Sequence, residues 1–144
     1  INQELNQFKM IYRAEGEGTK LLSQKQAGEQ VDILGPLGTG FDIEDVQANE
    51  TVVLVGGGIG VPPMYEMAKR LHAKGNKVIA VLGFASSVDV FYEEEFKAYA
   101  DVYITTMDGS HGYKGNVVEL INDKQLNFDW IYGCGPKVML KATD

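Results

Sequence analysis

Val52-Val-Leu-Val-Gly-Gly-Gly-Ile-Gly-Val-Pro-Pro63 is the stretch that best indicates the fold of this chain. Four aliphatic residues predict a short buried strand, and two prolines follow where a helix would begin, a position that tolerates the missing N–H. A strand, a glycine turn and a helix N-terminus together can bind a pyrophosphate, because free N–H groups and the helix dipole attract negative charge. The turn contains Gly56, Gly57, Gly58 and Gly60.

A tight turn without a ligand is the alternative interpretation of the same glycines. Val61 occupies the place of the third glycine in the usual G-x-G-x-x-G pattern. The motif therefore predicts a nucleotide without identifying which one.

The composition is that of a globular protein, with 144 residues, 44% hydrophobic residues and a net charge of -7. The negative charge argues against nucleic acid as a partner, and no apolar run approaches the ~20 residues needed to span a membrane. The single cysteine, Cys134, excludes an internal disulfide and fits a cytoplasmic location. No signal peptide is visible, and both ends of the sequence suggest a fragment of a longer protein.

Two regions differ in their sequence pattern. Residues 1–46 predict β-structure, with strands at 8–15 and 30–34 and one helical turn at 16–23 that is capped by Thr19. The boundary is expected near residues 48–50.

From Thr51 onward the pattern alternates between strands and helices, so we expect an α/β fold with a parallel sheet covered on both faces. The expected strands are 52–55, 77–82, 102–106 and 130–132, and the expected helices are about 61–74, 92–99, 116–123 and 136–143.

Four loops rich in glycine or small polar residues follow the four expected strands, at the sheet edge where ligands bind in such folds. Gly83 and Phe84 could lie under a ribose or adenine, although core packing is the alternative for Phe84. Ser86 and Ser87 could bind ribose hydroxyls or cap the next helix. No arginine is present in this loop to pair with a 2′-phosphate, so NAD is favoured over NADP.

Three other features are weaker candidates. Cys134, between two glycines after the last strand, could lie beside a nicotinamide ring or be an inert buried thiol. Asp108, Ser110 and His111 do not predict a catalytic triad, because no nucleophile-elbow motif is present. Two histidines and one cysteine argue against a structural zinc site, and the acidic run at 93–95 is interpreted as a solvated first helical turn.

Several motifs in order resemble a known family. They are Ile11-Tyr-Arg13 with Gly16-Glu-Gly-Thr19, Gly35-Pro-Leu-Gly-Thr-Gly-Phe41, the glycine run, Val90-Phe-Tyr-Glu-Glu-Glu-Phe96, Asp108-Gly-Ser110 and Cys134-Gly-Pro136. Together they resemble the electron-transfer subunits of bacterial dihydroorotate dehydrogenase B, which are ferredoxin-reductase-like flavoproteins. The resemblance covers essentially the whole chain.

The resemblance implies a redox function in pyrimidine biosynthesis. A partner subunit containing FMN would oxidise dihydroorotate, and electrons would pass through a [2Fe–2S] cluster and FAD to NAD⁺. Residues 1–48 would be the C-terminal part of an antiparallel FAD-binding β-barrel, and residues 49–144 would be the NAD-binding domain. The family's first flavin segment and its four cluster cysteines are absent from this sequence.

The same resemblance implies the site residues. FAD would contact Ile11, Tyr12, Arg13, Gly18 and Thr19. The NAD site would include Gly56, Gly57, Gly58, Gly60, Gly83, Phe84, Asp108 and Gly135, with Cys134 at the point of hydride transfer. A related flavin reductase subunit, such as a sulfide dehydrogenase or ferredoxin–NADP reductase subunit, and a non-catalytic nucleotide-binding module are the alternatives.

Overall fold

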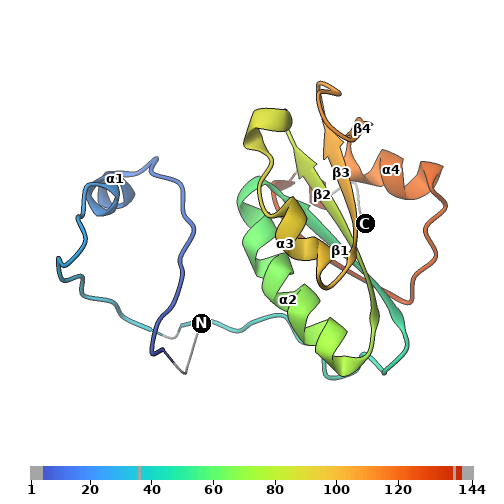
Figure 1. Ribbon diagram of the computed structural model, residues 1–144, viewed down its shortest axis with the longest axis horizontal. Helices are drawn as coiled ribbons and strands as arrows, with labels where there is room; N and C mark the ends of the chain where they lie inside the picture. Colours follow the sequence, from blue (N-terminus) through green and yellow to red (C-terminus); the bar gives the residue numbers. More distant parts are fainter. Residues whose placement is uncertain (1–4, 36, 138, 141–144) are drawn as a thin grey trace. The chain divides into compact units, whose positions relative to one another are not determined.

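The structure is a computed structural model that describes residues 5–35, 37–137 and 139–140 (Figure 1). The chain divides into two compact units, Ile1–Gly40 and Phe41–Asp144. Within the described residues, none of the helices has both the length and the apolar character needed to cross a membrane.

Among its described residues, the first unit contains one helix, α1 (Glu17–Ser23). Thr19 caps it from within the first turn, because its Oγ1 accepts a hydrogen bond from the N–H of Gly16 at 3.1 Å. The predicted strands at 8–15 and 30–34 are wrong, since neither segment forms a strand. A strand is stable when it pairs with neighbours and buries one face, whereas apolar side chains here, such as Phe8 and Ile33, stay more than half exposed.

The second unit is built on a five-stranded sheet in which every pairing is parallel (Figure 1). The strand order is β4-β3-β2-β1-β5. This result confirms the predicted α/β class with a parallel sheet. The strands are β1 (Thr51–Gly57), β2 (Lys77–Phe84), β3 (Asp101–Thr106), β4 (Tyr113–Lys114) and β5 (Trp130–Cys134).

Three α-helices cover the two faces of this sheet. α2 (Val61–Lys74) and α3 (Glu93–Lys97) pack on one face, and α4 (Val117–Asp123) packs on the other. β1 shows the cause, because Val52 and Leu54 point into the first core and the alternate residues Val53 and Val55 point into the second.

The structure extends the sequence-based expectations in two places. β4 was not predicted, because two residues are too few to show a strand pattern and the surrounding turns depend on positive φ at Gly109, Gly112 and Gly115. The expected helix at 136–143 is described at residues 136, 137, 139 and 140, of which the last three are helical, while residues 138 and 141–143 lie outside the described residues.

The segment from Phe41 to Glu50 packs against the amino ends of the strands. Val46 is fully buried, and the Lys74 Nζ donates to the carbonyl of Ile43 at 2.7 Å. The buried Asn76 side chain donates to the carbonyl oxygens of Gln47 and Glu50 at 2.6 and 3.2 Å. These contacts fix the entry of the chain into β1.

We predict that Leu54→Ala lowers the free energy of unfolding of this unit by about 2–5 kcal/mol, since Leu54 is fully buried in β1, which has a paired strand on each side. The fluorescence of Trp130, the only tryptophan of the chain, reports on the neighbouring β5 during urea denaturation. Val88→Ala is the control, because Val88 is 89% exposed, and it should change the free energy by less than about 0.5 kcal/mol. Equal midpoints for the two variants would contradict this description of the core.

Candidate functional site

The order of the strands places a topological switch point beside β1. The chain runs from β1 to β2 and β3 on one side and then crosses to β5 on the other. The turns after β1 and β5 therefore leave the sheet at neighbouring positions, where Gly56 is paired in register with Cys134. Ligands of open parallel sheets bind at such a point, beyond the carboxyl ends of the strands.

Three of the four glycines of the run let the chain pack against itself: Gly56 and Gly57, which end β1, and Gly60 in the turn that follows. A Cβ at Gly60 would lie 2.0 Å from the carbonyl oxygen of Cys134, and a Cβ at Gly57 would lie 2.7 Å from the Sδ of Met139. A Cβ at Gly56 would also be crowded, by a side chain at 3.1 Å. These glycines are needed for packing whether or not a ligand is present.

Gly58 is different, because it faces open space. A Cβ added there would meet no heavy atom within 4 Å, and its φ of 51° lies in the left-handed region. Gly58 opens the short 3₁₀ turn Gly58–Gly60 that leads directly into α2. Its backbone is therefore available to a ligand at the start of a 14-residue helix.

The N-terminus of α2 suits an anion. No side chain caps the helix at Gly60, and its first turn contains no acidic residue. The positive end of the helix dipole is therefore not neutralised by the protein. Together with the open Gly58 backbone, this arrangement fits a phosphate group.

The two candidate residues that end β2, Gly83 and Phe84, are both packed. Gly83 is packed, since a Cβ there would lie 2.9 Å from the Cγ1 of Val117. Phe84 is 6% exposed and its ring packs on Phe91 with centroids 5.7 Å apart, so core packing is the role that its burial favours.

Ser86 and Asp89 form a polar group on this turn. The Asp89 carboxylate accepts hydrogen bonds from the N–H and the Oγ of Ser86 at 3.2 and 2.9 Å. A short 3₁₀ turn, Ser87–Asp89, follows Ser86. The carboxylate therefore adds negative charge to the carboxyl end of β2.

Asp108 lies on the turn after β3, where its carboxylate accepts hydrogen bonds from the Oγ and N–H of Ser110 at 2.6 and 3.0 Å. These bonds lower the pKa of the exposed Asp108 carboxyl. The His111 ring instead contacts Glu93, with 2.7 Å between Nε2 and Oε2. The three residues therefore do not form a triad, in agreement with the sequence analysis.

Cys134 is the last residue of β5 and is half-buried at the switch point. A Cβ at the following Gly135 would lie 3.2 Å from the Cα of Gly57, so the turns after β1 and β5 touch through their backbones. The described residues contain no group of His, Cys, Asp and Glu side chains able to hold a metal ion.

The residues that resemble a flavin site lie in the first unit. Ile11 and Arg13 are exposed, and Arg13 pairs with Glu15 at 3.3 Å. Tyr12 is half-buried, while Gly18 and Thr19 lie in the first turn of α1, where a Cβ at Gly18 would meet no atom within 4 Å.

A cavity of about 380 Å³ lies at the edge of β3 and was not predicted from the sequence. It is bounded by β3, α4 and the turn before β4, and no residue of the glycine run lines it. Its lining includes Glu93, Tyr103, His111, Tyr113 and Lys124. The residues come from four separate parts of the chain, which explains why no sequence motif marks it.

Comparisons with known proteins agree with this geometry. Residues 54–144 match the family described as oxidoreductase NAD-binding domain. The chain is 53% identical over all 144 residues to the electron transfer subunit of dihydroorotate dehydrogenase B (NAD(+)) from Bacillus cereus, and equally similar to that of Bacillus anthracis. It spans 56% of the length of each of these relatives. The resemblance inferred from the motifs is thereby confirmed.

Solved structures show the same fold. A structure described as NADH-dependent reduced ferredoxin-NADP oxidoreductase has a TM-score of 0.77 and 32% identity, over 90% of this chain and 47% of the other. Flavohemoglobin from Malassezia yamatoensis has a TM-score of 0.74 over 93% of this chain and 37% of its own. At 21% identity, the second likeness supports the fold alone.

We predict that Gly58→Val weakens NADH binding by about tenfold or more, which corresponds to about 1.4 kcal/mol. The branched side chain would occupy the open space and disfavour the positive φ. Calorimetric titration of the folded variant with NADH measures the affinity.

Gly75→Val is the matched control. Gly75 also has a positive φ, 91°, and open space around its Cβ position, but it ends α2 instead of preceding it. It should cause similar backbone strain and leave NADH affinity unchanged. Similar losses of affinity in both variants would show that strain, and not the nucleotide site, explains the effect.

Proposed function

Because this chain belongs to the oxidoreductase NAD-binding domain family, we propose that it binds a nicotinamide dinucleotide at the carboxyl ends of β1 and β5. The observation that carries this proposal is Gly58, whose open backbone at positive φ precedes an uncapped helix N-terminus. The pyrophosphate would lie there. The NAD-binding domain would comprise residues 49–144, and residues 1–48 would be part of a FAD-binding barrel.

We propose NAD rather than NADP as the nucleotide. The turn after β2 contains no arginine or lysine between Gly83 and Phe96, so nothing on it would pair with a 2′-phosphate. The Asp89 carboxylate held by Ser86 would repel that phosphate and could accept a hydrogen bond from a free ribose hydroxyl. Gly83 and Asp108 would support the same crevice from the ends of β2 and β3.

The biological role proposed is that of an electron-transfer subunit of dihydroorotate dehydrogenase B, as the relatives are named. In that role, electrons from an FMN-containing catalytic subunit would reach NAD⁺ through a [2Fe–2S] cluster and FAD, which supply the redox chemistry. The cluster would be bound by the part of the relatives that this chain does not span. The protein would act in the cytoplasm.

The chain's own residues would bind and orient these groups. Ile11, Tyr12 and Arg13 would contact FAD, with the Arg13 guanidinium toward phosphate, and Gly18 and Thr19 would bind pyrophosphate. In support, the Arg13 side chain is exposed and Gly18 has no neighbour within 4 Å of its Cβ position.

Cys134 would act as a positioning group for hydride transfer. It is half-buried and its carbonyl carbon and oxygen crowd the turn that contains Gly60, so its place beside the proposed pyrophosphate site is fixed by the backbone. The thiol would hold the nicotinamide ring in register with the flavin by contact, without forming a bond.

Flavin reduction by NADH tests the proposed function. We predict that NADH bleaches the flavin absorbance of the FAD-loaded full-length protein, and that NADPH does so at least about tenfold less efficiently, a difference of about 1.4 kcal/mol. A non-catalytic nucleotide-binding module would bind NADH and leave the flavin oxidised. Equal efficiency with NADPH would contradict the specificity, and the identity of the partner is tested by adding the catalytic subunit with dihydroorotate and following NADH formation.

We also predict that Cys134→Ala in the full-length protein slows flavin reduction by NADH by up to about 100-fold while FAD content stays unchanged, because a misplaced ring reacts slowly. Stopped-flow spectroscopy measures the rate. Phe128→Ala, which alters an exposed side chain on the loop before β5, at the amino end of that strand, is the control. A wild-type rate for Cys134→Ala would identify the cysteine as inert.

A further inference from the structure

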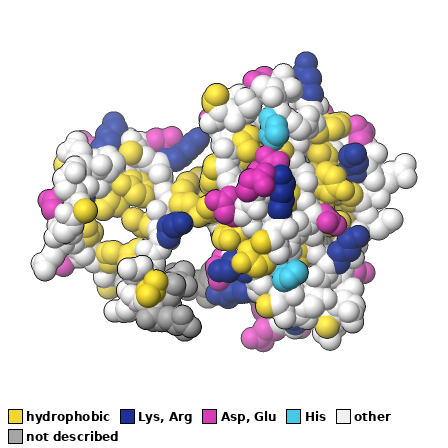
Figure 2. Space-filling view, in the orientation of Figure 1, with side chains coloured by type: hydrophobic (Ala, Val, Ile, Leu, Met, Phe, Trp, Pro, Cys, Tyr) yellow, Lys and Arg dark blue, Asp and Glu magenta, His cyan; other side chains and the backbone are white. Residues whose placement is uncertain are grey.

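A hydrogen bond between the side chains of Glu93 and His111 joins α3 to the turn after β3. The His111 Nε2 lies 2.7 Å from the Glu93 Oε2, and the Lys97 Nζ lies 3.5 Å from the other carboxylate oxygen. The Glu93 side chain is 25% exposed. Burial opposes its ionisation, but the His111 hydrogen bond and charge, with Lys97, outweigh this effect and lower the pKa of Glu93. Figure 2 shows a histidine against acidic and basic side chains on this face.

The backbone of His111 is also hydrogen-bonded, to the side chain of Thr106. Its N–H donates to the Oγ1 of Thr106 at 3.1 Å, and that hydroxyl donates to the carbonyl of His111 at 2.8 Å. Thr106 is completely buried at the end of β3. Thr106 therefore holds the turn at 107–112 to the sheet, and the Glu93–His111 contact joins the same turn to α3.

The turn at 107–112 is also hydrogen-bonded to the turn after β2. The Oγ of Ser110 accepts a hydrogen bond from the N–H of Ser87 at 2.7 Å, and the N–H of Asp108 donates to the carbonyl of Ala85 at 3.3 Å. Ser87 directly follows Ser86, which binds Asp89. A displacement of the 107–112 turn would therefore move the proposed ribose-binding group.

On the other side of the Glu93–His111 contact, the residue before Glu93 is packed against α2. Tyr92, the residue before α3, has a φ of 66°, which is unusual for a bulky residue. Its ring packs on Tyr65 of α2 with centroids 5.0 Å apart, and its carbonyl accepts from the N–H of Phe96 at 3.1 Å. Glu93 thus projects from a backbone that packing holds in one conformation.

We propose that Glu93 and His111 are a positioning pair for the nicotinamide nucleotide, acting through the turns after β2 and β3 without touching the nucleotide. This inference rests on the proposed NAD site. The pair keeps the Ser110–Ser87 hydrogen bond in place, and so presents Ser86 and Asp89 in one arrangement to the ribose.

A series of variants tests the pair, because charge alone and positioning predict opposite changes in NADH affinity for Glu93→Ala. Glu93→Ala removes a negative charge, which by itself should strengthen binding of the anionic NADH. Positioning predicts the opposite, a weakening of about 3- to 10-fold, the range of moderate coupling between contacting residues. His111→Ala should weaken binding by a similar factor, and the double variant should lose little more than either single one.

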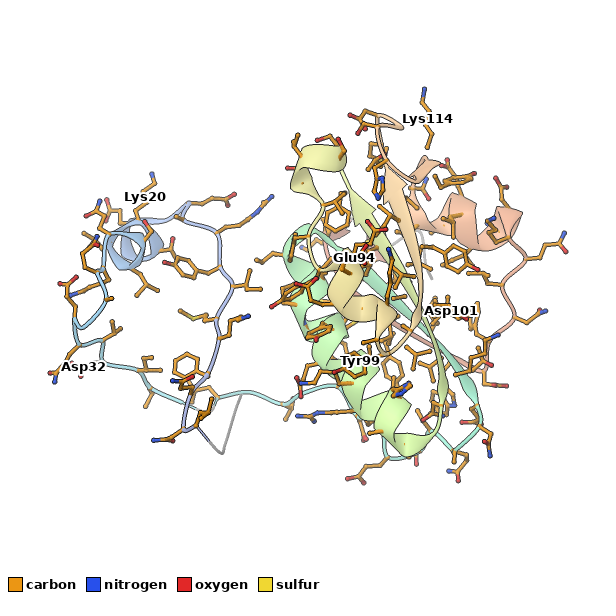
Figure 3. The ribbon with its side chains drawn as sticks, in the orientation of Figure 1. Lys20, Asp32, Glu94, Tyr99, Asp101 and Lys114 are labelled. Atoms are coloured by element: carbon orange, nitrogen blue, oxygen red, sulfur yellow. The ribbon has the colours of Figure 1, made fainter. Side chains whose placement is uncertain are left out.

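Glu94→Ala is the matched control. Glu94 is on the same short helix (Figure 3), its side chain is 80% exposed, and it pairs with Lys97 and not with His111. It should leave NADH affinity unchanged or slightly higher. Glu93→Gln replaces Glu93→Ala if the latter does not fold. Hydrogen exchange of the Ser87 amide, measured without nucleotide, should accelerate in the Glu93 and His111 variants alone.

The outcomes separate this inference from the proposed function. If the unaltered chain does not bind NADH in calorimetry, the proposed nucleotide site is wrong, and the positioning role fails with it. If the unaltered chain binds NADH and the Glu93 and His111 variants bind equally well, only the positioning role is overturned. A weakening in Glu94→Ala as large as in Glu93→Ala would also overturn it.

Discussion

The close approach of two main-chain turns is the constraint on which the carboxyl edge of the sheet depends. A Cβ at residue 60 would lie 2.0 Å from the carbonyl oxygen of Cys134, and a Cβ at Gly135 would lie 3.2 Å from the backbone of Gly57. The chain segments that follow β1 and β5 therefore approach each other through their main chains, with the Met139 side chain packed beside Gly57 and Gly135. The crowding inside this junction leaves Gly58 as the member of the run that faces outward.

The other turns at this edge depend on side chains instead. Ser110 joins the turns after β2 and β3 through the Ser87 amide, and His111 joins the second of them to α3 through Glu93. One part of this edge is a junction of main chains, suited to a pyrophosphate. The other part is held by side-chain hydrogen bonds, so a substitution at Glu93 or His111 can change its geometry. This division matches the two demands of a dinucleotide, which are charge neutralisation at the phosphates and shape recognition at the ribose.

The sequence was sufficient to predict the sheet because its central strands are continuous apolar runs bounded by glycine. It failed at 8–15 and 30–34, where alternation alone indicated strands but the structure assigns none to these described residues. Glycine spacing located the turn after β1 but could not separate Gly58 from its packed neighbours, since that difference depends on β5, about 75 residues later. The sequence also did not indicate the contact of Glu93 with His111, because the two residues are 18 positions apart and meet only when β3 pairs with β2.

The packed glycines also differ in how evolution can change them. At Gly83 the obstacle to a Cβ is the side chain of Val117, at 2.9 Å, so a smaller residue at 117 could compensate for an alanine at 83. At Gly60 the obstacle is a peptide carbonyl, which every amino acid carries. No second substitution can remove it, so a lineage that lost Gly60 would have to rebuild the junction itself. Position 83 can drift together with its neighbour, whereas position 60 cannot.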